Sequence, residues 1–212
     1  MSITHVPSDE TMLAYAAGTL SCAQRLVVET HLALCEQSRA WAGTLEEIGG
    51  VLIEDIDPVD VAPDALDRVF ARIDAMPAEP KSAVSDAEIA ALPEPLRHYP
   101  MSPWRKAGRG TFIRYVLTPE EGDHRLILFK IDPGKKMPQH SHSGQELTCV
   151  ISGSYSDESG RYGPGDFEEA GDDFSHRPVI DSDEPCICIV ALTGKMKLEG
   201  FVGRLLQPFV RL

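Results

Sequence analysis

One stretch, from Gly134 to Gly153, restricts the possible folds of this chain most, because it combines metal-ligand side chains with a strand-like composition. His140 and His142 are two residues apart, and Glu146 follows four residues after His142. Alternate residues of a β-strand point to the same face, so an H-x-H pair can present two imidazoles to one metal ion. Glu146 has the same parity, and a turn or bulge before it decides whether its carboxylate converges on the histidines. The stretch therefore predicts a metal cage built on β-strands.

The second half of the chain, from about residue 98, has the periodicity of short strands. Five β-prone runs are separated by turns rich in Gly, Pro, Asp and Ser: TFIRYVLT at 111–118, HRLILFKI at 124–131, QELTCVISGSYSD at 145–157, CICIVAL at 186–192 and FVGRLLQPFV at 201–210. Several strands at such spacing indicate an antiparallel sandwich or barrel.

Residues 1–76 predict helices instead, since their apolar residues recur at helix spacing and show no sustained alternation. Ser8 and Ser21 are candidate N-caps. Three or four helices result: 9–18, a long helix over 22–43, a third segment at 44–55 weakened by a pair of glycines, and 65–76, which has one apolar and one charged face.

The proline-rich composition of residues 77–97 is that of a linker between the two halves. We therefore expect an α+β chain of two domains. The helical domain covers residues 1–76, the linker residues 77–97, and the β domain residues 98–212.

Charge and cysteine content exclude several functions. The net charge of −13 argues against direct binding to nucleic acid or to an anionic membrane, since phosphate recognition needs a basic face. The first 76 residues carry 13 acidic and four basic side chains, so they form either a solvated surface or one that attracts a basic protein. Five cysteines, an odd number, and a start without the features of a signal peptide predict a cytoplasmic chain without a disulfide framework.

The pattern G-x5-H-x-H-x3-E-x6-G, from Gly134 to Gly153, resembles the first motif of the cupin superfamily, small β-barrels of jelly-roll type that hold one metal ion. YGPGDFEEAGDDFSH, at 162–176, resembles the second motif, although its usual proline and glycine are replaced around residues 171–174. The resemblance implies a C-terminal antiparallel cupin barrel and a fourth ligand, His176. Three imidazoles and a carboxylate bind Zn, and also Mn, Fe, Ni or Cu.

Cys186 and Cys188 are alternate residues of one predicted strand, so their side chains lie on the same face. At strand spacing their Cα atoms are about 6.6 Å apart, near the upper limit for a direct disulfide. Two interpretations stay open: buried apolar cysteines, or thiols that respond to oxidants.

A second ligand set is predicted on the long helix. His31 and Cys35 are four residues apart and share a helix face, on which Ser38 follows. The segment resembles the zinc-binding anti-sigma domain family, whose mark is H-x3-C-x2-C with an upstream histidine, here His5. Ser38 stands where the second cysteine belongs, and a neutral hydroxyl is a poor zinc ligand, so both a three-ligand zinc site and a metal-free helix pair are compatible with the sequence.

Together the two halves resemble the ChrR-type anti-sigma factors, through AYAAGTL, LVVETHLALC and ELTCVISGSYSDESGRYGPGD. This resemblance implies a regulator that binds an extracytoplasmic-function sigma factor through its helical domain. Its cupin domain would release sigma on oxidative stress, such as singlet oxygen or an organic peroxide. The alternative is an enzyme, a metal-dependent cupin dioxygenase or isomerase whose helices serve a homodimer.

Overall fold

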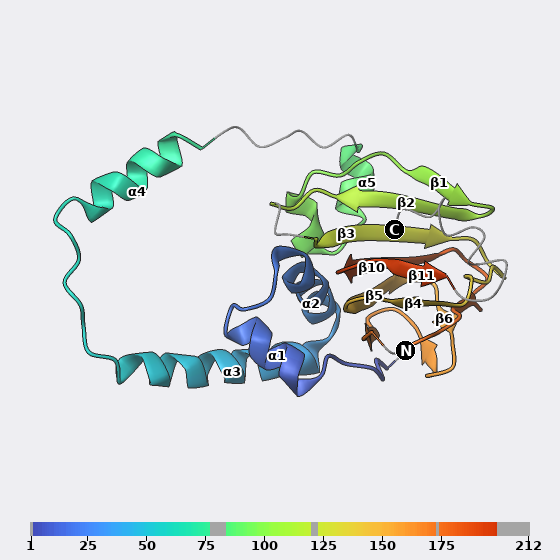
Figure 1. Cartoon of the computed structure of the whole chain (residues 1–212), viewed down its shortest axis with the longest axis horizontal. Helices are drawn as coiled ribbons and strands as arrows, with labels where there is room; N and C mark the ends of the chain where they lie inside the picture. Colours follow the sequence, from blue (N-terminus) through green and yellow to red (C-terminus); the bar gives the residue numbers. More distant parts are fainter. Residues whose placement is uncertain (1, 77–83, 120–122, 173, 199–212) are drawn as a thin grey trace.

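A computed structural model describes residues 2–76, 84–119, 123–172 and 174–198 (Figure 1). Helices come first: α1 Asp9–Ala16, α2 Cys22–Leu34, α3 Glu36–Glu54, α4 Ala65–Asp74, α5 Asp86–Ala90 and the 3₁₀ helix η1 Glu94–His98. Strands follow: β1 Arg105–Gly108, β2 Thr111–Val116, β3 Arg125–Ile131, β4 His140–His142, β5 Glu146–Ser152, β6 Tyr155–Ser156, β7 Arg161–Tyr162, β8 Phe167–Ala170, β9 Val179–Ile180, β10 Cys186–Leu192 and β11 Met196–Leu198. Within these ranges no helix combines the length and apolar character that crossing a membrane requires.

The first two helices begin where the sequence predicts. The Ser8 side chain accepts a hydrogen bond from the Thr11 backbone N–H, and Ser21 forms a capping box with Gln24. These contacts satisfy backbone N–H groups that have no partner inside a helix.

The predicted helix over 22–43 is wrong at its centre. Cys35 has an extended backbone (φ −114°, ψ 106°), so the chain breaks there into α2 and α3. The Cys35 N–H still closes α2 on the His31 carbonyl, and α3 then runs uninterrupted through Gly49 and Gly50 to Glu54. Each glycine costs a helix only about 1 kcal/mol relative to alanine, which is too little to end it.

The strands pair antiparallel throughout, in a six-stranded sheet of order β1-β2-β3-β10-β5-β8 and two small sheets, β11-β4 and β7-β6-β9. Single bridges, Lys136 to Val179 and His140 to His176, add contacts between the shorter segments. Helices N-terminal to an antiparallel sheet confirm the predicted α+β order. The predicted run at 201–210 lies outside the described residues.

The central strands divide the interior into two apolar clusters. On one face of β5, Leu147 and Cys149 pack in a cluster with Leu26 and Val27 of α2. On the other face, Val150 packs in a second cluster with residues of β3 and β10. This alternation follows from the period of two residues along a strand. Helix α2 therefore covers one face of the sheet (Figure 1), and the predicted metal ligands lie on the other.

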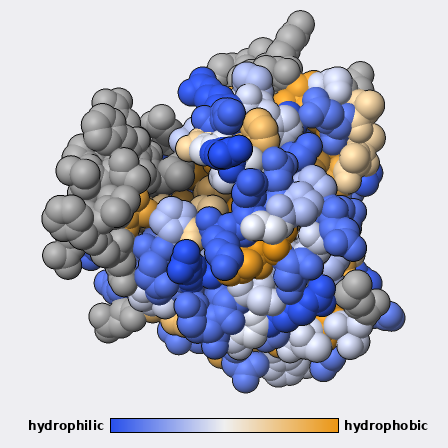
Figure 2. Space-filling view, turned by 90° about the vertical axis from the view of Figure 1, so that its right-hand side faces the viewer, coloured by the Kyte–Doolittle hydropathy of each residue, from blue (hydrophilic) through white to orange (hydrophobic). Residues whose placement is uncertain are grey.

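The second half of α3 and all of α4 lie outside this interior. None of the α4 residues is buried, and Figure 1 shows α4 set apart from the other elements. In α3 the buried residues, Ser38, Ala42 and Leu45, all belong to its first ten positions. By contrast, the strand end of the molecule, seen in Figure 2, is mostly hydrophilic with small hydrophobic patches between polar residues.

Candidate metal centre

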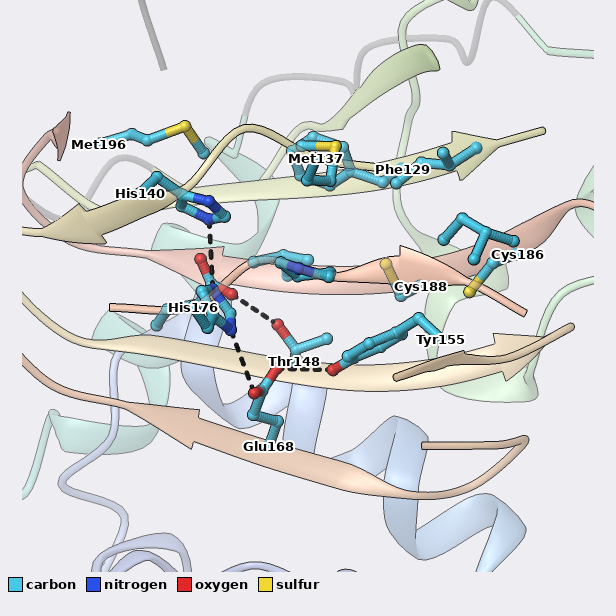
Figure 3. Close-up of a pocket in the computed structure, with 15 residues that line it drawn as sticks. Phe129, Met137, His140, Thr148, Tyr155, Glu168, His176, Cys186, Cys188 and Met196 are labelled. Carbon is cyan, nitrogen blue, oxygen red and sulfur yellow. Dashed lines mark hydrogen bonds and ion pairs between the residues drawn. The ribbon is translucent and has the colours of Figure 1, made fainter. Parts of the chain in front are cut away.

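The structure brings together the four ligands predicted in the strand half: His140, His142, Glu146 and His176. All four are buried, and one ligand atom of each lies within 4.8 Å of those of the other three. Strand β4 supplies the two histidines of the H-x-H pair on one face, as the strand period requires. Figure 3 shows His140 and His176 pointing toward each other.

Glu146 reaches the cage because the chain turns sharply between β4 and β5. Gly144 lies in this turn, and a Cβ atom there would come within 2.6 Å of the Thr193 backbone carbonyl oxygen. Only glycine allows so close an approach. Glu146 then begins β5, with an Oε2 atom 2.9 Å from His142 Nε2.

The hydrogen bonds around the cage orient two of the imidazoles as metal ligands. His140 donates Nδ1–H to the Pro138 carbonyl at 2.8 Å, and His176 Nδ1 lies 3.0 Å from Asp157 and 3.2 Å from Glu168. Both rings therefore direct Nε2 inward, and these two atoms are 3.2 Å apart. Two facing lone pairs at this distance repel each other unless a cation or a proton lies between them. The donor set fits a divalent metal ion.

The charge balance of the cage also favours a cation. Burial alone raises the pKa of Glu146, but the three surrounding histidines outweigh it and lower the pKa to about 2. Burial lowers the pKa of His140. Burial also opposes protonation of His176, but the Glu168 carboxylate, with Glu146 and Asp157, raises its pKa to about 9.

Two carboxylates behind His176 were missed by the sequence prediction. Asp157 and Glu168 contact His176 on its outer side, and the Tyr155 hydroxyl donates to Glu168 at 2.6 Å. Burial raises the pKa of Glu168 to about 7, against the hydrogen bonds from His176 and Tyr155. Asp157 ends the predicted run at 145–157 and Glu168 lies in the stretch that resembles the second motif, but acidic residues at such places are too common to single out this contact.

A small cavity of about 50 Å³ adjoins the cage. It extends from His140 and His176 to Cys188 and then Cys186, as Figure 3 shows. Its other lining residues are mostly apolar: Phe129, Ile131, Met137, Glu146, Thr148, Tyr155, Glu168, Pro178, Ile180, Val190 and Met196. This volume suits a few water molecules or a very small apolar molecule.

The two cysteines of β10 are free thiols on the same face, as their spacing predicts. Both are buried. Hydrogen bonding to Cys186, followed by burial, raises the pKa of Cys188 well above its ordinary value. The Cys188 side chain is therefore a neutral thiol.

The N-terminal set is not brought together in the same way. Among the described residues, no group of three or more potential ligands includes His5, His31 or Cys35. The His5 ring packs on Tyr162 with centroids 4.4 Å apart, whereas His31 contacts Ser38 and Gly165. Cys35 is buried at the junction of α2 and α3.

Comparison with known proteins identifies a family. Residues 96–196 match the family model of the ChrR cupin-like domain. The chain is 39% identical to anti-sigma-E factor ChrR of Cereibacter sphaeroides over 217 residues, which covers 100% of both chains. Its structure is similar to that of the anti-sigma ChrR crystallised in complex with SigE of Rhodobacter sphaeroides, with a TM-score of 0.69 and 38% identity over 90% of this chain and 99% of that one.

Proposed function

Because this chain belongs to the ChrR family of anti-sigma factors, we propose that it binds an extracytoplasmic-function sigma factor and keeps it from RNA polymerase. The similar protein is an anti-sigma factor, and the similar solved structure is an anti-sigma factor bound to SigE. Both favour this function over the dioxygenase or isomerase alternative.

The observation that carries the proposal is the apolar surface that the end of α3 and all of α4 each leave uncovered. We call it the docking face. Its residues are each at least half exposed: Ile48, Val51, Leu52, Ile53 and Ile56 at the end of α3, and Leu66, Val69, Phe70, Ile73 and Met76 on and after α4. A ten-residue helix is marginal in water by itself, and so much exposed apolar surface marks a site for a protein partner. Helix α4 therefore needs a groove on a partner to bury this face.

Charge complements the docking face. The 13 acidic and four basic side chains of the first 76 residues give this part of the chain a strong negative potential. Such a potential accelerates encounter with a basic protein surface and weakens as salt increases. We expect the sigma factor to present a basic surface around an apolar groove.

A pair of neighbouring substitutions on α4 tests the docking face. Phe70→Asp places a charge on the apolar side, and we expect it to weaken binding to the cognate sigma factor by about 2 kcal/mol, roughly 30-fold in Kd. Ala71→Asp introduces the same side chain at an exposed position on the opposite side of the helix and is the matched control. Titration calorimetry with the full-length chain measures both. Equal Kd values for the two variants would remove α4 from the interface.

We further propose that the strand half, residues 98–212, is the sensory domain, connected by residues 77–97 to the sigma-binding helices at 1–76. In this proposal its sheets enclose a cupin barrel, and His140, His142, Glu146 and His176 hold a metal ion, with Zn expected and Mn, Fe or Ni compatible. The metal would supply a Lewis-acidic centre next to the small cavity. Oxidative stress, from singlet oxygen or an organic peroxide, would alter this centre or the nearby thiols.

The two faces of β5 offer a route from this centre to the helices. Glu146 and Thr148 face the cage and cavity, whereas Leu147 and Cys149 pack in the cluster that contains α2. Strand β5 therefore lies between the metal ligands and α2, the helix that supports the proposed sigma-binding segment. Packed interiors shift between discrete arrangements instead of deforming gradually, so a local change can move α2.

The sensory role is tested with His140→Ala. Because His140 lies on the far side of the sheet from α2, we expect sigma binding within about twofold of wild type. Release of sigma on treatment with singlet oxygen or a small organic hydroperoxide is expected to be strongly reduced. The measurement is the fraction of sigma that stays bound during size-exclusion chromatography after treatment. Release at the wild-type level would exclude the cage from sensing.

A further inference from the structure

Ser38, the residue that departs from the family pattern, contacts His31, and both ring nitrogens of His31 have a hydrogen-bond partner. Nδ1 lies 2.7 Å from the Gly165 carbonyl oxygen, and Nε2 lies 2.8 Å from the Ser38 hydroxyl. Since a carbonyl can only accept, Nδ1 carries the proton and Nε2 accepts the Ser38 O–H. The one lone pair that His31 could offer to a metal ion is therefore used within the protein.

The neighbouring candidate ligand, His5, is held in a different direction. Its backbone N–H donates to Asp166 at 2.9 Å, and its carbonyl accepts the Phe167 N–H at 3.0 Å, so the backbone is fixed on both sides. Its ring packs against Tyr162, and a Cβ atom on Gly160 would lie 3.3 Å from its Nε2. Bringing His5 to His31 would require breaking these contacts.

The donor set is also chemically incomplete. Cys35 is the single thiol of the set, because Ser38 occupies the position of the second family cysteine. Structural zinc sites in proteins are closed by four protein ligands, and a neutral hydroxyl competes poorly for zinc beside a thiolate. With the His5 ring packed on Tyr162 and Ser38 neutral, the residues present do not fit a structural zinc ion.

We propose that a buried hydrogen-bonded bridge, formed by Gly165, His31 and Ser38, replaces zinc in organising the helical half of this chain. Its two bonds connect α3 to α2 and α2 to the turn between β7 and β8. His31 is fully buried, and its ring meets Phe167 edge-on at 5.6 Å, so the bridge is shielded from water. The helices thus keep the arrangement that a zinc ion would otherwise fix, and the cupin cage stays as the proposed metal site among the residues that the structure describes.

Metal analysis of the full-length chain tests the proposal. The starting protein carries His140→Ala and His142→Ala, which remove the cupin ligands, and it is purified from zinc-supplemented cells. By plasma mass spectrometry we expect it to contain essentially no zinc. Adding Ser38→Cys should raise the content to about one equivalent, with three protein ligands and a water completing the site. Ser38→Ala is the matched control, because it removes the hydroxyl without supplying a thiolate, and it should add no zinc.

Cobalt provides a second measurement that does not depend on recovery of zinc. Only the Ser38→Cys chain should show thiolate-to-cobalt charge-transfer absorption from two cysteine ligands. A zinc equivalent in the starting protein that disappears with Cys35→Ala would overturn the proposal, and so would Ser38→Cys without a gain in metal. If the double alanine chain is not recovered, Cys35→Ala in the wild-type background decides, since its metal content should then equal that of wild type.

The outcome is separable from that of the anti-sigma function. The chain with His140→Ala and His142→Ala, treated with a strong chelator, should still bind its sigma factor with unchanged Kd if the bridge organises the helices. Loss of binding on chelation, restored by zinc, would contradict the bridge while leaving the anti-sigma function in place. Absence of binding in every sample would instead contradict the proposed function alone.

Discussion

At the scale of single residues, the outer contacts of His176 determine how well it can act as a ligand. Asp157 and Glu168 both lie within hydrogen-bond distance of its Nδ1 atom, and the Tyr155 hydroxyl holds Glu168 in place. These partners fix the tautomer and the orientation of the ring, so that Nε2 faces His140. The affinity of the cage for a metal ion would thus depend on residues outside the set of four ligands.

Glu168→Gln tests this orientation. The amide loses the negative charge that stabilises the Nδ1 proton, so we expect the metal affinity of the cage to fall by about 10- to 100-fold. Competition with a chromophoric chelator measures the affinity. Glu184→Gln makes the same change at an exposed position and is the control. Equal affinities for both variants and wild type would show that Asp157 alone orients His176.

The sequence predicted the residues of the cage better than their surroundings. His140 and His142 share a face because the strand period is local, and resemblance to a motif supplied His176. Asp157 and Glu168 meet His176 only through the pairing of distant strands, which no local pattern encodes. Similarly, helical periodicity continued through Cys35, although its extended backbone divides the predicted helix. On α4, periodicity predicted an apolar face but not that the face remains exposed.

At the scale of elements, the first residues of the chain run alongside β8. The Thr4 and His5 backbone N–H groups donate to Asp166 at 2.7 and 2.9 Å, and the Ser8 N–H donates to Glu169 at 3.0 Å. The other carboxylate oxygen of Asp166 accepts from the Gly163 N–H. A single side chain therefore connects the N-terminal segment to the turn that precedes β8.

We expect Asp166→Ala to destabilise the chain by about 1–3 kcal/mol, because it leaves backbone donors unpaired. Amide exchange at Thr4 and His5 should become fast while β10 stays protected, as measured by mass spectrometry. Asp181→Ala is the control, because Asp181 bonds side chains of the β6 and β7 region instead.

The same contacts predict a dependence on pH. Burial raises the pKa of Asp166, but the N–H donors of Gly163, His5 and Thr4 outweigh it, so the pKa lies below its ordinary value of 3.8. A carboxyl with a lowered pKa stabilises the folded state above its ordinary pKa and loses this contribution as pH falls through the folded value. The stability difference between wild type and Asp166→Ala should therefore be constant near neutral pH and shrink below about pH 4. A constant difference at acidic pH would contradict this assignment.

At the scale of the whole molecule, helices and strands share an interior. The cluster that includes Leu26 and Val27 of α2 also includes Leu128, Leu147 and Ile189 of three neighbouring strands. Burial of this kind removes the apolar stripe of α2 from water only when the sheet is present. We therefore expect α1, α2 and the first part of α3 to unfold together with the sheet, whereas α4 contributes little to cooperativity.

The two tryptophans report on this coupling. Trp41 lies on α3. Trp104 precedes β1, and the Arg114 guanidinium carbon lies 4.4 Å from the centroid of its ring. Trp104→Phe leaves fluorescence from the helices alone, and Trp41→Phe leaves it from the strand half alone. For each variant, the urea unfolding curve followed by fluorescence should coincide with the curve followed by circular dichroism. Fluorescence from Trp41 that changes well before the circular dichroism would show that the helices unfold independently.

The two faces of β5 restrict the length of the strand more than its composition. Residues 146 and 148 face the cage and cavity while 147 and 149 face the helices, so inserting or deleting one residue would exchange the two sets downstream of the change. Point substitutions at 147 or 149 alter one face at a time, and a compensating change in α2 can accommodate them. A length change would place apolar side chains in the cage and polar ones beneath α2 at once. Strand β5 therefore tolerates substitutions more readily than an insertion or a deletion.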